Sequence, residues 1–362
     1  MTQLRCLQKI EAEKAEGFMI VPNWPTQAWF GRLLNLLIDE PIILPIIRQH
    51  LQGTGLSDET TKIILSAWRQ STHKQYSVYT RKWLDFCNRR QTNPMQLPVK
   101  EVLDFLTLLF KNSGYSALNT ARSALASVAL TDGYTVSSHP LISRFMKGVF
   151  HLKPPRARYQ TTWDVKFVLD YLPNLPELNS MSLKDLSLKT CMLIALVSAQ
   201  RVQTLQLLNI DDIGSHMLMS PTLCTFIVQD LVKQSRPGRT GLKVALAAYP
   251  QDKRICVLAC LNEYLRRTSS LRGQEKYLFI SYRKPYKRVT TDTISRWLKD
   301  VMTRAGIDVD VYKAHSTRAA TTSKAACNSV PMSEVLTHVG WSREGTFQAF
   351  YIPQTCRHAK YC

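Results

Sequence analysis

The stretch Lys313-Ala314-His315-Ser316-Thr317-Arg318 carries a histidine and an arginine three positions apart. Side chains with this spacing lie on one face of a helix, where both can contact the same anion. Val339-Gly340-Trp341 follows, and Phe350-Tyr351 lies close to the C-terminus. The indole of Trp341 can only donate a hydrogen bond, whereas the phenol of Tyr351 can act as a nucleophile.

This order of motifs, His-x-x-Arg, then Gly-Trp, then a late tyrosine, resembles the C-terminal end of the tyrosine recombinases, the phage-integrase family of DNA strand-exchange enzymes. The resemblance extends over roughly residues 60–355. It implies a mainly α fold with a small antiparallel sheet (α+β), in which an N-terminal helical core-binding domain precedes a C-terminal tyrosine recombinase catalytic domain. It also implies an enzyme that cleaves and rejoins double-stranded DNA through a 3′-phosphotyrosyl intermediate.

Two arginines are expected to clamp the reacting phosphate. Transesterification requires that the charge of the transition state is neutralised, and arginine suits this task because its fork matches phosphate geometry and stays protonated. Neither a metal nor a cofactor is then required. Arg318 is one arginine, and the resemblance places the other at Arg201, directly after an apolar helix. Thr204 departs from the family, which usually has an acid there to orient the arginine; a hydroxyl or a nearby glutamine can substitute.

The resemblance also assigns the proton-transfer residues. The family's general acid is a lysine in the hairpin loop of the small sheet, which protonates the departing 5′-hydroxyl. Lys233 fits best, at the end of a predicted strand, and Lys243 across the loop is the competitor. His315 and Trp341 are expected to hydrogen-bond the non-bridging oxygens or to manage the proton of the nucleophile. Trp341 replaces the second histidine of many relatives.

Tyr351 is the predicted nucleophile, although its spacing is unusual. The commonest family spacing after Trp341 is nine residues, which falls on Phe350, whereas Tyr351 is ten residues away. A shift of one residue rotates a helical side chain by roughly 100°, so the assignment requires a local kink or a differently placed helix. Tyr361, one residue from the end of the chain, is the alternative.

The charge of the chain indicates a polyanionic partner. Its 362 residues include 47 lysines and arginines against 27 acids, a formal charge of +20. Such a field concentrates nucleic acid at the surface. The alternatives are a solvated basic surface and membrane association, but the sequence shows no run of 18 apolar residues and no signal-peptide pattern. We therefore expect double-stranded DNA as the partner, with no membrane contact and no secretion.

The nine cysteines are scattered and include no Cys-x-x-Cys pair, which predicts free thiols in a reducing, intracellular compartment. Cys256 and Cys260 could face one metal, but no partners with zinc spacing lie nearby. The segment Ile255–Arg267 is predicted to be an amphipathic helix, so both thiols are expected in the core.

Composition and periodicity divide the chain into segments. Residues 57–152 are expected to form the helical core-binding (SAM-like) domain, 153–158 a basic linker, and 159–362 the catalytic domain. Between Ser57 and Lys153 there are thirteen basic residues against six acids, so the first domain is net basic. For DNA contacts we expect the basic side chains of Lys74, Arg122, Lys153, Arg156, Arg158 and Arg236.

Local patterns predict individual elements. Ser71 or Thr72 is expected to cap the helix that carries Tyr76 and Trp83, and Thr291 to cap the helix that ends at Gly306. Further helices are expected over Asn119–Ala129, Ile142–Phe150, Val165–Leu172 and Leu186–Ala199, and strands over Thr225–Leu231 and Leu242–Ala247.

Residues 1–56 resemble the end of the reverse transcriptase/RNase H polyprotein of DIRS-type retroelements, on the strength of Val21-Pro22-Asn23-Trp24-Pro25-Thr26-Gln27-Ala28-Trp29. Their other interpretation is an apolar arm packed against a domain. The DIRS resemblance implies a retrotransposon recombinase that acts as a homo-tetramer on DNA in the nucleus; otherwise a cytoplasmic location is expected. The alternatives are a catalytically inactive or host-recruited DNA-binding relic and a type IB topoisomerase-like nicking-closing enzyme.

Overall fold

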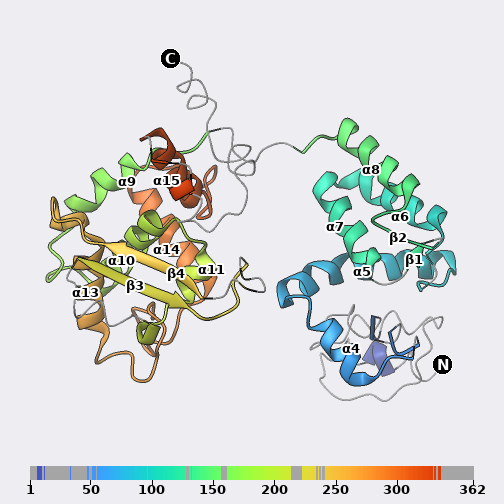
Figure 1. Ribbon diagram of the computed structural model, residues 1–362, viewed down its shortest axis with the longest axis horizontal. Coiled ribbons are helices and arrows are strands. Elements are labelled where there is room, and N and C mark those ends of the chain that lie inside the picture. The colour runs from blue at the N-terminus through green and yellow to red at the C-terminus, as the bar shows by residue number, and fades with distance from the viewer. Residues whose placement is uncertain are drawn as a thin grey trace. The chain divides into compact units, whose positions relative to one another are not determined.

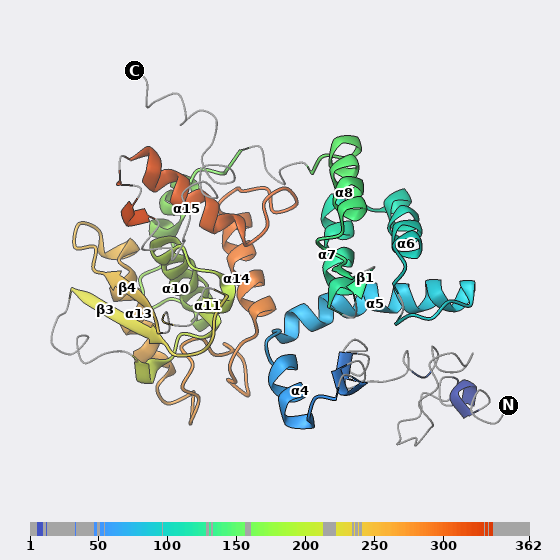
Figure 2. The same cartoon turned by 45° about the vertical axis from the view of Figure 1, so that its right-hand side comes forward.

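The structure, a computed structural model, describes residues 6–9, 12, 33, 47–48, 51–53, 55–95, 97–127, 130–131, 133–155, 161–212, 222–233, 235, 238, 241–328, 330–331 and 333–335. The chain divides into two compact units, unit 1 (Met1–Arg156) and unit 2 (Ala157–Cys362). Figures 1 and 2 show the elements of both units from two directions. The division falls within the basic segment 153–158.

Unit 1 is a helical bundle with one short hairpin. Its elements are α4 (Asp58–Leu65), α5 (Gln70–Arg90), α6 (Val99–Asn112), α7 (Tyr115–Ala126), β1 (Leu130–Thr131), β2 (Tyr134–Thr135) and α8 (Pro140–Leu152). Helix α7 packs against α5, α6 and α8, and Figures 1 and 2 show these helices side by side. Strands β1 and β2 pair antiparallel.

An aromatic cluster forms the core of unit 1. Trp83 of α5 is 1% exposed, and its ring centroid lies 5.3 Å from that of Phe105 on α6. Phe86, one turn after Trp83, stacks on the same indole at 5.7 Å. The indole Nε1 donates a 3.0 Å hydrogen bond to the carbonyl of Pro94, which satisfies the polar edge of a buried ring.

Unit 2 consists of helices around a two-stranded sheet. Its elements are α9 (Lys166–Tyr171), η1 (Leu172–Asn174), α10 (Leu183–Ser198), α11 (Val202–Gln206), η2 (Ile210–Asp212), β3 (Leu223–Val228), β4 (Leu242–Ala247), η3 (Lys253–Ile255), α13 (Val257–Thr268), α14 (Thr291–Arg304) and α15 (Ser316–Cys327). Strands β3 and β4 are antiparallel, with Leu223 opposite Ala247 and Val228 opposite Leu242. The predicted mainly α fold with a small antiparallel sheet is confirmed.

Helix α10 is the centre of unit 2. It packs against α11, α13, α14, α15 and β4, and twelve of its sixteen residues are buried. Ser182 caps its start by accepting a hydrogen bond from the Asp185 N–H. Lys189, inside the helix, donates a 2.9 Å hydrogen bond to the Leu172 carbonyl, and its burial lowers its pKa. A helix that is buried on nearly all sides can position the elements at both of its ends.

Several element boundaries differ from the sequence-based predictions. Strand β3 begins at Leu223 and ends at Val228, before the predicted end at Leu231, whereas β4 has the predicted bounds. Thr290, rather than Thr291, caps α14, because its hydroxyl accepts a hydrogen bond from the Thr293 N–H. Hydrogen bonds decide where a strand ends and which residue caps a helix. Local composition predicts these positions only to within a few residues.

Two further features of unit 1 were predicted wrongly or missed. Helix α5 begins at Gln70, ahead of the expected caps Ser71 and Thr72, and its N-cap Arg69 makes no side-chain capping bond. The β1–β2 hairpin was not predicted, because two-residue strands show no alternating pattern.

The cysteines follow the prediction at most described positions. Cys6, Cys87, Cys191, Cys224, Cys256 and Cys260 are free thiols. Helix α13 covers Val257–Thr268 and buries Cys260, as expected for a core thiol. The expectation is wrong at Cys327, which is disulfide-bonded.

Candidate active site

Arg201 lies at the sharp turn that joins α10 to α11. Ala199 ends α10 in the left-handed conformation, with φ of 49°, and the chain then reverses into α11. Arg201 is the N-cap residue of α11 and is half-buried. Thr204, one turn later in the sequence, is 1% exposed. The turn therefore fixes the position of the Arg201 backbone at the N-terminus of α11.

Arg318 lies in the first turn of α15, and His315 is the N-cap residue of that helix. His315 has helical backbone angles, φ of −64° and ψ of −22°, so the predicted i to i+3 relation to Arg318 is present in the structure. His315 is exposed, whereas Arg318 is 2% exposed. Burial strengthens the electrostatic interactions of a guanidinium, because the surrounding dielectric is low.

Both arginines therefore occur near helix N-termini, and both helices pack against α10. Helix α15 also contacts α14, where the Thr317 hydroxyl lies 3.9 Å from the Met302 sulfur. Helix α11 packs against α14 as well. Residues more than a hundred positions apart in the sequence thus lie on one framework formed by α10 and α14.

The start of unit 2 anchors α15. The buried Trp163 donates a 2.9 Å hydrogen bond from Nε1 to the Ser316 hydroxyl, the first helical residue of α15. Asp164 forms an ion pair with Lys324 at 3.4 Å. The backbone N–H of Lys166, followed by the charge of Lys324, holds the pKa of Asp164 below its usual value, against the effect of desolvation. Sequence reasoning missed these anchors because no local signal links positions 153 residues apart.

We expect Trp163→Phe to lower the free energy of unfolding and to slow DNA cleavage, because α15 loses the hydrogen bond at its first residue. The loss of a buried hydrogen bond costs about 1–2 kcal/mol beyond the change in packing. Denaturant unfolding and single-turnover cleavage measure the two effects. Trp83→Phe is the matched control, because Trp83 is also buried and loses a hydrogen bond of similar length, to the Pro94 carbonyl in the core of unit 1. Equal cleavage by the two variants would contradict the anchoring role.

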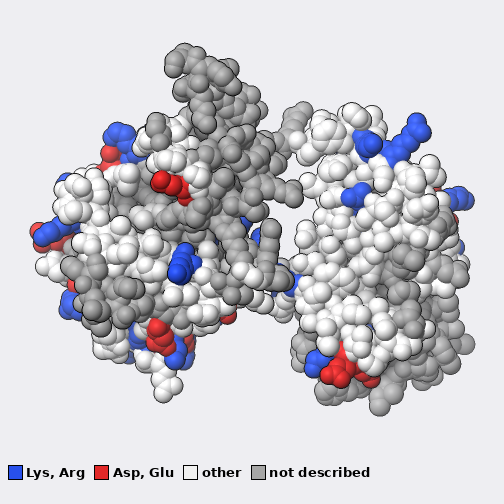
Figure 3. All heavy atoms as spheres, in the orientation of Figure 1, with Lys and Arg blue, Asp and Glu red and all other residues white. Residues whose placement is uncertain are grey.

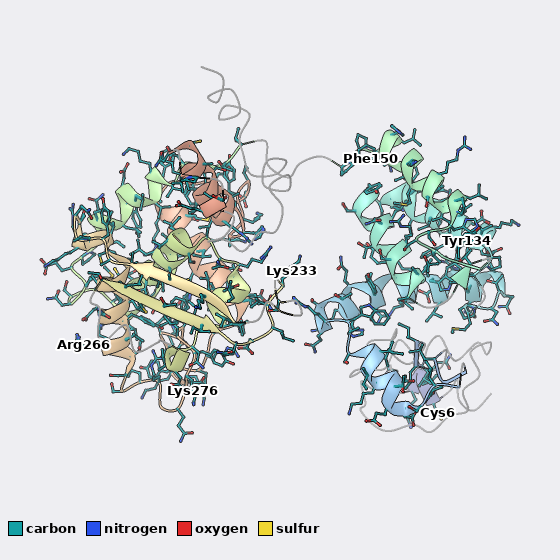
Figure 4. The ribbon with its side chains drawn as sticks, in the orientation of Figure 1. Cys6, Tyr134, Phe150, Lys233, Arg266 and Lys276 are labelled. Carbon is teal, nitrogen blue, oxygen red and sulfur yellow. The ribbon has the colours of Figure 1, made fainter. Side chains whose placement is uncertain are left out.

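Lys233 lies in the loop after β3 and is exposed. The turn around it is closed by two hydrogen bonds, from the Val232 N–H to the Ser235 hydroxyl at 3.0 Å and from the Ser235 N–H to the Val232 carbonyl at 2.9 Å. Figure 4 shows its side chain extending from the loop rather than from the strand. The prediction that Lys233 ends the strand is wrong, since β3 ends at Val228.

Lys243, the competing lysine, lies on β4 opposite Ile227 and is exposed. Val244 and Leu246 of the same strand are buried, so Lys243 belongs to the strand face that points away from the core. A strand residue has little freedom to approach a substrate, whereas a loop residue can be presented to it.

We expect Lys233→Ala to slow cleavage of a normal phosphodiester and to recover most of the lost rate with a 5′-phosphorothiolate substrate, whose leaving group needs no proton. Lys243→Ala is the control and should behave like the wild type with both substrates. Single-turnover cleavage measures each combination. Rescue of Lys243→Ala instead would transfer the general acid to that position.

The described residues place only part of the predicted DNA-binding set. Lys74 on α5 is exposed, and Arg122 on α7 is half-buried with Nη2 donating to Asn119 Oδ1 at 2.8 Å. Lys153 donates a 2.7 Å hydrogen bond to the Phe110 carbonyl and lies 4.3 Å from the centre of that ring, so its ammonium group is already engaged. Outside the described residues lie three further members of this set, Arg156, Arg158 and Arg236. The same holds for Trp341 and Tyr351 of the predicted catalytic set.

Basic side chains are spread over the described surface. On the face shown in Figure 3, blue lysine and arginine groups occur on both units and acidic groups are fewer. Among the described residues no group of three or more histidine, cysteine or acidic side chains could hold a metal ion. No helix within the described ranges is long and apolar enough to cross a membrane.

The chain has the fold of the tyrosine recombinases, as comparison with solved structures shows. No protein-family model and no curated protein matches its sequence. The XerH site-specific recombinase bound to its palindromic difH substrate, in a post-cleavage complex, aligns with a TM-score of 0.57 and 12% identity, over 90% of this chain and 97% of that one. The Tn1549 transposon integrase in complex with transposon right end DNA aligns with a TM-score of 0.52 and 11% identity, over 88% and 99%.

A lambda integrase dimer bound to a COC′ core site aligns with a TM-score of 0.51 and 14% identity, over 82% of this chain and 94% of that one. These three structures are complexes of recombinases or integrases with DNA. At these identities the similarity concerns the fold, and the chemistry has to be argued from the residues of this chain.

Proposed function

We propose that this protein is a site-specific recombinase that cleaves and rejoins double-stranded DNA through a 3′-phosphotyrosyl intermediate, without a metal or a cofactor. The observation that carries the proposal is the placement of Arg201 and Arg318 near the N-termini of two helices packed on α10, in a chain with the tyrosine recombinase fold. The planar fork of an arginine binds two oxygens of a phosphate at once. The DNA-bound state of the three similar structures supports the same substrate.

Each residue has a defined part in the proposed reaction. The phenolic oxygen of Tyr351 attacks the phosphorus, and the bond from phosphorus to the 5′-oxygen breaks. Arg201 and Arg318 neutralise the charge that develops on the non-bridging oxygens, and Lys233 protonates the departing 5′-oxygen. Trp341 donates a hydrogen bond to a non-bridging oxygen, and His315 hydrogen-bonds the phosphate or takes up the phenol proton. Rejoining is the reverse, in which a 5′-hydroxyl attacks the phosphotyrosyl bond and releases Tyr351.

The finer assignment follows from the sequence resemblance. The resemblance of residues 1–56 to the end of a DIRS-type polyprotein favours an origin in a DIRS-type retrotransposon. On that assignment the protein acts in the nucleus and assembles as a homo-tetramer on DNA. Sedimentation of the purified protein with and without a DNA site tests the assembly, and a monomer on saturating DNA would exclude it.

The decisive experiment uses a suicide substrate, a duplex nicked so that the short fragment carrying the released 5′-hydroxyl diffuses away and cannot rejoin. We expect a covalent protein–DNA adduct that survives denaturation, in the presence or absence of EDTA. Strict dependence on a divalent metal would move the protein to a different class of nuclease or integrase.

A second candidate is a DNA-binding relic without catalysis. The buried Thr204 favours it, because Thr204 has a neutral hydroxyl at the position where the resembled family usually has an acid that orients the arginine. The same experiment separates the two functions, since a relic binds the duplex and forms no adduct.

A further inference from the structure

Helix α11, which begins directly after Arg201, is too short to maintain its own conformation. It has five residues, Val202–Gln206, whereas an isolated helix is marginally stable only from about 12–15 residues. Its N-cap residue is Arg201, whose guanidinium has no hydrogen-bond acceptor and therefore cannot cap the helix. Contacts with other elements must fix α11, and with it the position of Arg201.

Packing and a backbone hydrogen bond restrain α11 in part. Thr204 and Leu205 are buried, and the helix packs against α10 and α14, which lie beside it in Figures 1 and 2. Beyond its end, the Leu278 N–H donates to the Leu208 carbonyl at 2.7 Å. Apolar packing is not directional, so it restrains the rotation of a five-residue helix only weakly.

Gln206, the last residue of α11, supplies a directional contact. Its half-buried side chain donates from Nε2 to the Val289 carbonyl at 3.1 Å, across 83 residues of sequence. Val289 is itself fixed, because it is 5% exposed and its N–H donates to the carbonyl of the buried Phe279 at 3.2 Å. Both residues belong to the hydrophobic core of unit 2. The hydrogen bond therefore joins the end of α11 to a rigid point of that core.

Arg201 and Gln206 lie at opposite ends of α11, about 7.5 Å apart along the helix axis at a rise of about 1.5 Å per residue. A movement of the helix that breaks the Gln206 bond also moves the Arg201 backbone. Catalytic groups have to be held within about 0.5 Å of the productive geometry, and a displacement of about 1 Å can cost about 100-fold in rate. The bond at one end of α11 can therefore control the arginine at the other end.

Thr204 explains why this chain needs such a bond. The family that the sequence resembles usually has an acid at this position, which orients the arginine. A threonine is neutral and cannot form an ion pair with a guanidinium. Gln206 lies on the same short helix and can orient the arginine through the helix backbone instead.

We propose that Gln206 is a positioning residue, which holds α11 and thereby Arg201 in the orientation that the cleavage reaction requires; the inference rests on the proposed function. Gln206 compensates for the acid that is absent at Thr204. This role needs no contact between Gln206 and the DNA.

Gln206→Met tests the proposal, because methionine keeps the length of the side chain and its helix propensity and removes the hydrogen-bond donor. Gln203→Met is the matched control, at an exposed position of the same helix. Single-turnover cleavage of a suicide substrate is followed at saturating DNA. We expect Gln206→Met to lower the rate constant by about 10–100-fold, with unchanged affinity for an uncleaved duplex, and Gln203→Met to change neither quantity. Partial unfolding would lower the amplitude of the reaction and not its rate constant.

The same substitution in the Arg201→Ala background distinguishes positioning from a general structural role. If Gln206 acts through Arg201, Gln206→Met has little further effect once the arginine is absent. An equal loss of rate in both backgrounds would overturn the proposal. Where the Arg201→Ala rate is too low to measure, a substrate with a methylphosphonate at the cleavage site replaces this background, because its phosphorus centre carries no charge for Arg201 to neutralise. The effect of Gln206→Met should disappear with that substrate, and an undiminished effect would contradict the proposal in the same way.

The failure of this proposal and the failure of the proposed function give different results. A wild-type protein that forms no covalent adduct would overturn both. Adduct formation by the wild type, together with equal rate constants for Gln206→Met and Gln203→Met, would overturn the positioning role and leave the recombinase function intact.

Discussion

The Tyr351→Phe variant is expected to form no covalent adduct with a suicide DNA substrate, while its affinity for the duplex stays close to that of the wild type. The substitution removes only the phenolic oxygen, the atom that forms the bond to phosphorus, and leaves the basic residues that hold DNA unchanged. Adduct formation is measured on a denaturing gel, and affinity by titration with an uncleaved duplex.

Tyr361→Phe is the matched control for that experiment and should form the adduct to the wild-type yield. Adduct formation by Tyr351→Phe together with its loss in Tyr361→Phe would transfer the nucleophile to Tyr361. Adduct formation by both single variants would discard the assignment of a C-terminal tyrosine.

Arg318→Ala and Arg201→Ala are each expected to slow single-turnover cleavage by about 10²–10³-fold or more, because each removes donors aimed at charge that develops in the transition state. Overall affinity should change little, since half or more of the hydrogen bonds between a protein and DNA go to backbone positions elsewhere. The comparison of cleavage rate with affinity therefore separates loss of catalysis from loss of binding. If either variant cleaved DNA at the wild-type rate, that arginine would have a structural and not a catalytic role.

The burial of Arg318 requires an additional variant. Alanine leaves a cavity at a residue that is 2% exposed, so a lower rate could reflect unfolding. Arg318→Lys keeps the charge and most of the volume but loses the planar fork that binds two oxygens at once. We expect this variant to unfold close to the wild-type denaturant midpoint and still to cleave slowly. Arg254→Ala, at an exposed arginine paired with Asp252, should leave both quantities unchanged.

The sequence alone predicted the features that local chemistry determines. Helical periodicity identified the main helices, and the alternation in Leu242–Ala247 predicted the bounds of β4 correctly. The order of the motifs predicted a tyrosine recombinase fold, which the structure confirms. These predictions succeed because each depends on side chains that are neighbours in the chain, on one face of a helix or one side of a strand.

The tertiary structure decided which of these side chains are buried and what holds them. Sequence spacing placed His315 and Arg318 on one helical face, but only packing against α10 makes the first exposed and the second buried. The bond from Trp163 to Ser316 and the bond from Gln206 to Val289 join positions 153 and 83 residues apart. Contacts of this kind leave no periodic or compositional signal, because the sequence around each partner is typical of an ordinary helix or loop.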